Sequence, residues 1–252
     1  LNLTPYSLAN NDHYVALQTA TVDIAANLQR QTQSTVTGIP DTAGVLTTRG
    51  YAQSFVDMGT NRRALRFAFM DFMCLDMEQL MDTTTPDFRV RRDVTRSPGG
   101  DSSVYRNRCA GCHGGMDGLG GAFAHFDFVN GTLVYNANAV QPKMNRNEGE
   151  FPDGFVTEDD SWINLWTTGQ NARLGWDGAT SGSGVRELGQ SFAQSDQFAS
   201  CMATRVFKRV CMTSGTSEED AASIAQLATT FRQDNFNIRN LFASSATRCA
   251  GE

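Results

Sequence analysis

The feature that most constrains this chain is the segment Cys109-Ala110-Gly111-Cys112-His113, whose spacing is C-x-x-C-H. This spacing is the attachment signature of a c-type haem, in which each thiol forms a thioether to a haem vinyl group. The chemistry needs two sulfur atoms a turn apart and an imidazole directly after them, which makes His113 the proximal iron ligand. The sequence therefore predicts one covalent haem c on Cys109 and Cys112.

Paired cysteines also occur in zinc sites and in redox dithiols. A zinc site requires a second Cys/His pair at similar spacing, and the sequence contains none. A thioredoxin-like dithiol is expected within a βαβ pattern, which is missing as well. Haem attachment is therefore the favoured interpretation of the motif.

Length and charge exclude some classes of partner. The chain has 252 residues and a formal net charge of -6, with a pI near 5.1, so nucleic acid is not an expected partner. It contains no apolar run of about 18 residues, so we expect no membrane span. No signal peptide is visible and the first residue is Leu1, so we interpret the chain as a processed, mature product.

Four cysteines remain outside the motif: Cys74, Cys201, Cys211 and Cys249. Haem attachment to C-x-x-C-H takes place where disulfides persist, so two disulfides are expected, with four buried thiols as the alternative. Cys201 and Cys211 fall on one expected helix, about 15 Å apart, which is too far to bridge. An up-down-up set of C-terminal helices then favours Cys74–Cys201 and Cys211–Cys249. We expect a periplasmic or extracellular bacterial protein.

The pattern predicts a mainly α protein with three parts: an N-terminal arm and helix (1–41), a cytochrome c-like haem module (42–184) and a C-terminal three-helix unit (185–252). Within the haem module, Phe126 to Tyr135 is a hairpin with an Asn130-Gly131 turn. The long segment 136–184 is expected to be irregular.

Helical periodicity is expected over 13–31, over two helices within 42–81, and over 101–113, 185–212 and 237–247. Asn61 is a candidate cap for the second helix of 42–81, and Asp101 caps the helix that carries the motif. Thr216 and Glu219 form a capping-box pattern. The glycines of 114–121 suggest backbone packed against the porphyrin edge.

The run from Cys109 through Met116-Asp117 and Gly120, followed by Phe126-Asp127, resembles the haem-bearing module of large planctomycete- and proteobacterial-type c-type cytochromes. That family has C-x-x-C-H-x-x-(M/I)-D-P-x-G and then Phe-Asp. The resemblance extends over roughly 42–247, including Asn61-Arg62-Arg63. Gly118 replaces the usual Pro, His125 stands where Asn is common, and the family's longer N-terminal modules are missing. The resemblance implies a monohaem cytochrome, with Met116 and Phe126 near the haem, and no defined substrate.

The sixth iron ligand is left open by the sequence. Met144 is the first candidate, because it lies downstream on an irregular segment and a thioether ligand suits a carrier. His125 is the second, and an open iron is the third. Minor candidates are His13, Met116, Met202 and Met212. A local basic cluster consists of Arg89, Arg91, Arg92 and Arg96. It is either a solvated loop or a set of partners for the haem propionates, and Arg92 is the residue that we select as a haem contact.

Three functions follow from these features. The favoured one is a carrier of single electrons between redox partner proteins, because no convincing set of acid/base residues is present. The second is a subunit of a cytochrome filament or larger redox complex, with homo-oligomerisation through the arm. The third is a peroxidase-like haem enzyme with an open distal site.

Overall fold

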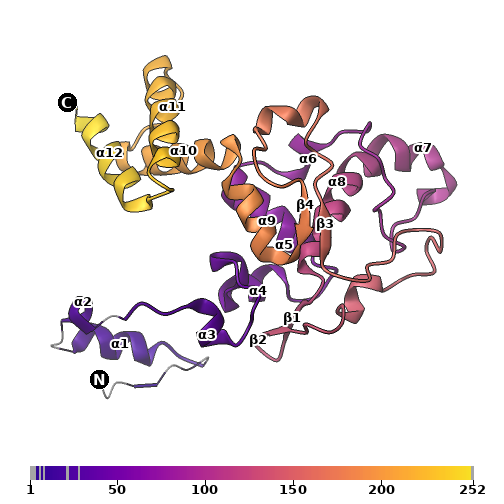
Figure 1. Ribbon diagram of the computed structural model, residues 1–252, viewed down its shortest axis with the longest axis horizontal. Coiled ribbons are helices and arrows are strands. Elements are labelled where there is room, and N and C mark those ends of the chain that lie inside the picture. Colours follow the sequence, from indigo (N-terminus) through magenta and orange to yellow (C-terminus); the bar gives the residue numbers. More distant parts are fainter. Residues whose placement is uncertain (1–3, 6, 8, 21–22, 28, 251–252) are drawn as a thin grey trace. The chain divides into compact units, whose positions relative to one another are not determined.

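The computed structural model describes residues 4–5, 7, 9–20, 23–27 and 29–250 (Figure 1). The chain divides into two compact units, Leu1–Ile39 and Pro40–Glu252. Most of the described residues outside loops are helical, and strands are few and short. The expected mainly α class is therefore confirmed.

In the first unit, α1 (Asp12–Thr19), α2 (Ile24–Asn27) and α3 (Gln33–Thr37) are short. The single helix expected over 13–31 is wrong, because Ala20 adopts extended backbone with φ -67° and ψ 127° and ends α1. None of the residues of α1 is buried. The ring of His13 contacts that of Tyr14, with centroids 3.9 Å apart.

The second unit begins with η1 (Gly44–Thr47), α4 (Arg49–Phe55), α5 (Arg62–Ala68), the π-helical turn η2 (Phe69–Met73) and α6 (Met77–Leu80). Asn61 precedes α5, but its side chain does not cap it. Its Nδ2 instead donates to the carbonyls of Phe123 (2.8 Å) and Phe126 (3.0 Å). Asn61 therefore joins the start of α5 to the hairpin region, which local pattern cannot reveal.

The cysteine motif lies on a longer helical stretch than expected. After η3 (Pro98–Gly100), the helix runs through α7 (Ser102–Val104), the π-helical turn η4 (Tyr105–Cys109), α8 (Ala110–Gly120) and η5 (Gly121–Phe123). The Asp101 side chain accepts from the Ser103 N–H at 2.8 Å, so the expected cap is confirmed. The helix does not end at His113, because the glycines after it stay helical and buried.

The hairpin consists of β1 (Phe126–Val129) and β2 (Thr132–Tyr135), paired antiparallel with Phe126 opposite Tyr135. Asn130 and Gly131 have φ of 50° and 79°. Positive φ at both central residues defines the type I′ turn that the sequence predicts.

The segment expected to be irregular holds more structure than predicted. It contains η6 (Pro142–Asn145), β3 (Ser161–Ile163), η7 (Gly169–Leu174) and β4 (Ser181–Ser183). Strands β3 and β4 pair antiparallel, with Ser161 opposite Ser183. Their side chains do not alternate strongly between apolar and polar, so the sequence gives little strand signal.

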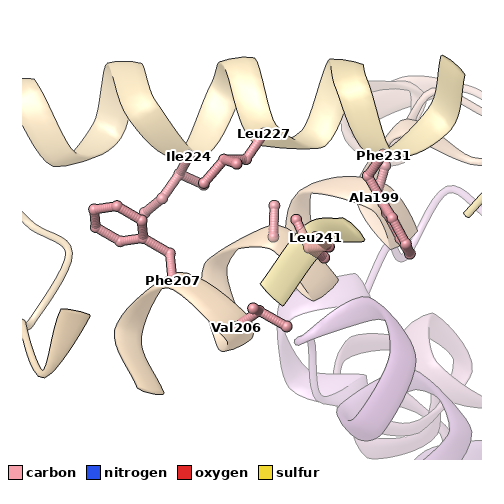
Figure 2. Close-up of a cluster of buried hydrophobic side chains, with 8 residues drawn as sticks. Ala199, Val206, Phe207, Ile224, Leu227, Phe231 and Leu241 are labelled. Atoms are coloured by element: carbon pink, nitrogen blue, oxygen red, sulfur yellow. The ribbon is translucent and has the colours of Figure 1, made fainter. Parts of the chain in front are cut away.

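The C-terminal region contains α9 (Gly184–Ala193), α10 (Asp196–Cys211), α11 (Glu218–Gln233) and α12 (Ile238–Ala250). The expected helix 185–212 is broken, because Ser195 caps α10 through its Oγ, which accepts from the Phe198 N–H at 3.1 Å. Ser217, not Thr216, caps α11. Helices α10 to α12 share the apolar cluster of Figure 2: Ala199, Ala203, Val206, Phe207, Ile224, Leu227, Phe231 and Leu241.

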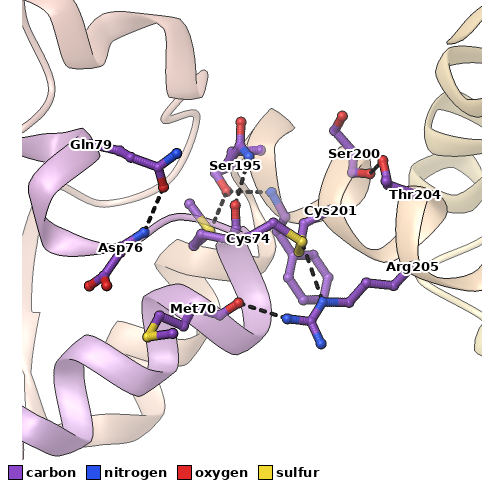
Figure 3. The surroundings of a disulfide bond; sticks show 12 residues. Met70, Cys74, Asp76, Gln79, Ser195, Ser200, Cys201, Thr204 and Arg205 are labelled. Atoms are coloured by element: carbon purple, nitrogen blue, oxygen red, sulfur yellow. Dashed lines mark hydrogen bonds between the residues drawn. A yellow bond between two sulfur atoms is a disulfide. The ribbon is translucent and has the colours of Figure 1, made fainter. Parts of the chain in front are cut away.

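Two disulfides join Cys74 to Cys201 and Cys211 to Cys249, with Cα atoms 5.4 and 5.3 Å apart. These are the two pairs expected from the sequence. Beside the Cys74–Cys201 bridge, Arg205 Nη2 donates to the Met70 carbonyl at 2.8 Å (Figure 3). The end of η2 is therefore joined to α10 by a disulfide and by a hydrogen bond. The disulfides close stretches of 127 and 38 residues, which in the chain-entropy account contribute about 5 and about 4 kcal/mol.

Disulfides are typical of proteins that mature outside the reducing cytosol. Among the described residues, no helix has the length and hydrophobicity needed to cross a bilayer.

Candidate functional site

Cys109, Cys112 and His113 form one side of the motif helix, which we call the thiol face. Cys109 closes η4, and the other two lie in the first turn of α8. Positions i, i+3 and i+4 of a helix point to the same side. Both thiols are free and half-buried, and the His113 side chain is 24% exposed. The three groups that haem attachment needs are therefore together and accessible.

The opposite side of α8 is a glycine face made of Gly111, Gly114, Gly115 and Gly118. A Cβ at Gly115 would overlap the buried indole of Trp166, and one at Gly118 would come within 2.8 Å of the Ile163 carbonyl. Gly114, Gly115 and Gly118 pack against protein, so the expectation that they line a porphyrin edge is wrong for these three. Gly115 and Gly118 let β3 and its flanking loop approach the helix backbone, and Gly111 and Gly114 do the same for the segment 81–86.

The thiol of Cys112 borders α6, with its Sγ 3.6 Å from the Met77 carbonyl. Burial raises the pKa of the Cys112 thiol, and the nearby Glu78, Cys109 and Asp76 raise it further. Redox dithiols and metal-binding cysteines have a lowered pKa. The electrostatics therefore do not favour a redox or zinc function for this pair.

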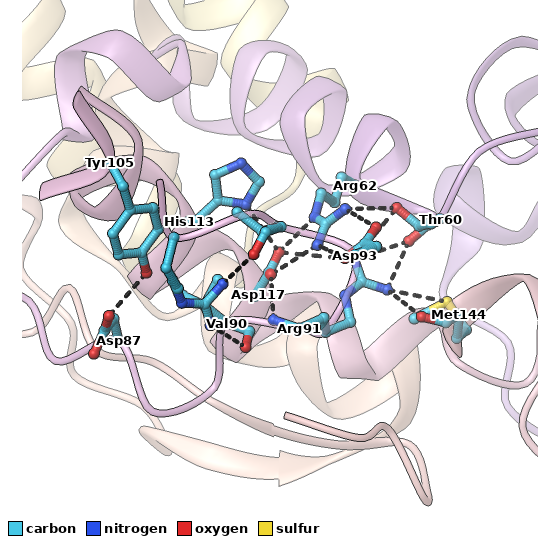
Figure 4. Close-up of polar contacts among 12 residues, drawn as sticks. Thr60, Arg62, Asp87, Val90, Arg91, Asp93, Tyr105, His113, Asp117 and Met144 are labelled. Atoms are coloured by element: carbon cyan, nitrogen blue, oxygen red, sulfur yellow. Dashed lines mark hydrogen bonds and ion pairs between the residues drawn. The ribbon is translucent and has the colours of Figure 1, made fainter. Parts of the chain in front are cut away.

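Behind the thiol face lies a buried ion cluster of two arginines and two aspartates (Figure 4). Arg62 forms a fork to each carboxylate: Nη1 and Nη2 bind Asp93 at 2.6 and 2.7 Å, and Nε and Nη2 bind Asp117 at 2.6 and 2.8 Å. The Arg91 N–H donates to Asp117 Oδ2 at 3.0 Å, and its guanidinium lies 3.7 Å from Oδ1. Two positive and two negative charges balance each other in a largely buried site.

Electrostatics fix the charge of this cluster. Burial by itself would raise the pKa of Asp117, but hydrogen bonds from Arg62 and the charges of Arg91 and Arg62 hold that pKa well below its usual range. Burial lowers the pKa of Arg91, and the charge of Asp117 partly offsets this. Asp117 is thus a carboxylate at any physiological pH.

His113 connects the thiol face to this cluster. Its Nδ1 is buried and lies 3.6 Å from Asp117 Oδ1, slightly beyond a hydrogen bond. The two nitrogens of an imidazole are on different sides of the ring, so Nε2 points away from Asp117. Nε2 is therefore the nitrogen that can bind a metal on the thiol face.

Met144, the first candidate for the sixth ligand, is not brought to that side. It is 1% exposed, and its Sδ lies 3.6 Å from Arg91 Nη1. A chain of contacts runs from His113 Nδ1 through Asp117 and Arg91 to Met144 (Figure 4). The thioether therefore lies on the Nδ1 side of the imidazole, beyond Asp117 and Arg91. A Met144–iron bond would require the Arg91 contact to break and the segment around η6 to move.

His125 lies beyond the other end of α8, after η5. Its Nδ1 is 3.7 Å from Asp160 Oδ2, and its ring meets that of Tyr135 edge-on, with centroids 5.7 Å apart. Burial raises the pKa of Asp160, and the charge of His125 offsets part of this. About 10 Å of helix separates His113 from Gly120 alone, so the structure does not bring the two histidines together.

The other residues predicted to contact the haem are buried or lie in other parts of the chain. Met116 and Phe126 are buried at 9% and 1% exposure, and the Phe126 carbonyl binds Asn61. Met202 packs against the C-terminal cluster, and Met212 is 87% exposed. His13 belongs to the first unit.

The four arginines of the basic cluster are neither a solvated loop nor a single group. Arg92 pairs with Glu148 at 3.6 Å, and Arg91 belongs to the ion cluster. Arg89 lies over Phe155, and Arg96 lies between the rings of Tyr105 and Phe151. Each guanidinium therefore has a protein partner.

The donor set fits a covalent haem. In a chain whose other four cysteines are paired, Cys109 and Cys112 stay unpaired beside an accessible imidazole. Among the described residues, no group of three or more His, Cys, Asp or Glu side chains could hold a metal ion alone.

Sequence reasoning missed Asp117 and Arg62 as members of the site. Both residues occur in the runs that carry the family resemblance, and Asp117 is four residues after His113, which places both on one side of a helix. That spacing is the signal that could have found the pair.

No protein-family model, curated protein or solved structure matches this chain.

Proposed function

We propose that this chain is a c-type monohaem cytochrome that passes single electrons between redox partner proteins outside the cytoplasm. The observation that carries the proposal is the thiol face: two unpaired thiols and an outward imidazole at i, i+3 and i+4 of one helix. Cys109 and Cys112 would hold the haem, and His113 Nε2 would bind its iron. The haem supplies the one-electron redox couple.

The protein contributes rigidity and electrostatics to this function. The glycine face fixes α8 against β3, and the neutral ion cluster places the Asp117 carboxylate 3.6 Å from the inner nitrogen of His113. A donor group held in place reorganises little when the iron changes its charge, which is what an electron carrier requires. Burial, hydrogen bonding and the sixth ligand then set the potential.

The direct test is expression of the exported chain in a bacterium that attaches haem to C-x-x-C-H motifs. The wild type should carry one covalent haem by mass and by pyridine haemochrome, and should titrate reversibly with one electron. The Cys109→Ala/Cys112→Ala variant should lose all covalent haem. A matched control, Cys211→Ala/Cys249→Ala, also removes two cysteines and should keep it. A wild type that folds without haem under these conditions would refute the proposal.

A second candidate is a haem enzyme with an open sixth position. It is favoured by one observation: Met144 packs against Arg91 and His125 against Asp160, so neither is brought next to His113. The spin state of the ferric protein separates the two candidates. A low-spin spectrum supports the carrier, whereas a high-spin spectrum together with rapid reaction with peroxide supports the enzyme.

A further inference from the structure

His113 has a buried ring nitrogen whose hydrogen-bonding need is unmet. Its Nδ1 is shielded from solvent and has no hydrogen-bond partner in this conformation. Buried polar groups in proteins are nearly always paired. A histidine that binds a metal through one nitrogen usually donates its other N–H to a carboxylate, a carbonyl or water. The partner of Nδ1 is therefore a functional question as well as a structural one.

Asp117 is placed to be that partner. It lies one helical turn after His113 on α8, and its Oδ1 is 3.6 Å from Nδ1. The backbone of α8 cannot shift easily, because the glycine face is in tight contact with Trp166 and Ile163. A small rotation of the imidazole is enough to close a hydrogen bond, and such bonds commonly shorten when the ligand is bound.

The surroundings of Asp117 prepare it for this function. Arg62 and the Arg91 backbone already donate three hydrogen bonds to its two oxygens. A carboxylate offers about four acceptor positions, so one remains for Nδ1. Because two guanidinium groups compensate its charge, Asp117 can stay ionised in a site that is closed to water.

We propose that Asp117 is the positioning residue of the proximal histidine. It accepts the Nδ1–H of His113, selects the tautomer that presents Nε2, and strengthens the imidazole as an electron donor. Stronger donation favours the oxidised iron, so the intact pair lowers the reduction potential. This inference rests on the proposed haem function and adds the residue that tunes it.

The test compares two variants of the same ion cluster in the haem-loaded protein. Asp117→Asn replaces the carboxylate beside His113 with a neutral amide, which is a weaker acceptor. Asp93→Asn neutralises the other carboxylate that Arg62 binds; Asp93 pairs with Arg62, whereas His113 pairs with Asp117. We expect Asp117→Asn to raise the midpoint potential by about 59 mV or more, a tenfold change in the one-electron equilibrium. In the five-coordinate ferrous form that follows photolysis of the carbon-monoxide complex, the same variant should lower the iron–histidine stretching frequency. Asp93→Asn should change both much less.

The wild type provides a second readout that needs no variant to fold. In the diamagnetic ferrous carbon-monoxide form, the Nδ1–H of His113 should give an NMR signal shifted downfield and protected from solvent exchange. Equal potentials in both variants, or an Nδ1–H that exchanges as freely as an exposed imidazole, would overturn the inference. Either result would leave haem attachment itself intact, because attachment is measured separately by mass.

Discussion

The two sides of helix α8 differ in what occupies them. The glycine face has no side chains, and Trp166 and the β3 backbone fill the space where a Cβ would be. The thiol face instead carries functional groups: Cys109, Cys112 and His113 are partly exposed, and both thiols are unpaired. Tight packing on the glycine face holds the helix, and the helix in turn holds these three side chains in place.

The comparison also shows where electrostatics enter. Asp117 lies at the edge between the two faces, and its charge is neutralised by Arg62 and Arg91 from other parts of the chain. Packing alone would position the helix but would leave the His113 ring free to turn. In our proposal, the hydrogen bond from His113 Nδ1 to Asp117 supplies the orientation that packing cannot.

The largest expected effect comes from removing the arginine that supports the thiol face. Arg62→Ala leaves the carboxylates of Asp93 and Asp117 buried without their main partner, which should lower the free energy of unfolding by about 3–5 kcal/mol. Chemical denaturation measures this loss. Arg66→Ala is the matched control, because Arg66 lies one turn later on α5 and makes an exposed pair with Asp76, worth less than about 1 kcal/mol. Equal losses in the two variants would contradict the buried cluster.

The next effect tests the glycine face. Gly115→Ala places a methyl group into the indole of fully buried Trp166. Overpacking of this kind typically costs about 1–3 kcal/mol, and we expect the upper part of that range because Trp166 has no room to move. Thermal unfolding measures the change. Gly120→Ala is the control, since nothing lies within 4 Å of its Cβ position; a similar loss there would argue against tight packing.

A smaller effect concerns pH at the rim of the thiol face. The hydrogen bond from Arg66 lowers the pKa of Asp76, whose carboxylate also accepts from the Met77 N–H. A lowered carboxyl pKa stabilises the fold above the unfolded value of about 3.9, and this contribution is lost as pH falls through the folded pKa. By NMR titration, Arg66→Ala should raise the pKa of Asp76 toward its ordinary value. Arg63→Ala, whose guanidinium binds the Asp57 carbonyl, should leave it unchanged.

The smallest expected effect is on the iron spectrum. Met144 lies on the Nδ1 side of His113 with its sulfur against Arg91. We therefore expect Met144→Ala to leave the visible and far-red spectrum of the oxidised protein unchanged. Loss of a far-red methionine–iron band in this variant would show that the η6 segment moves when haem is bound, and would restore Met144 as the sixth ligand.

Much of this protein is determined by local sequence. The type I′ turn follows from Asn130-Gly131, because only residues that tolerate positive φ can occupy both positions. Helix length excludes one of the three pairings of the four cysteines, and the choice between the other two depended on the expected up-down-up order of the C-terminal helices. The grouping of Cys109, Cys112 and His113 on one side of a helix follows from helical periodicity alone.

Other features were decided only by the tertiary structure. No local pattern assigns the glycines of α8 to Trp166 and β3, places Asn61 on the carbonyls of Phe123 and Phe126, or puts Arg91 between Asp117 and Met144. These contacts join residues that are 26 to 65 positions apart, so their partners depend on how the helices pack. Sequence periodicity sets which side of a helix a residue occupies, whereas the partner on that side is set by the free energy of burying the whole chain.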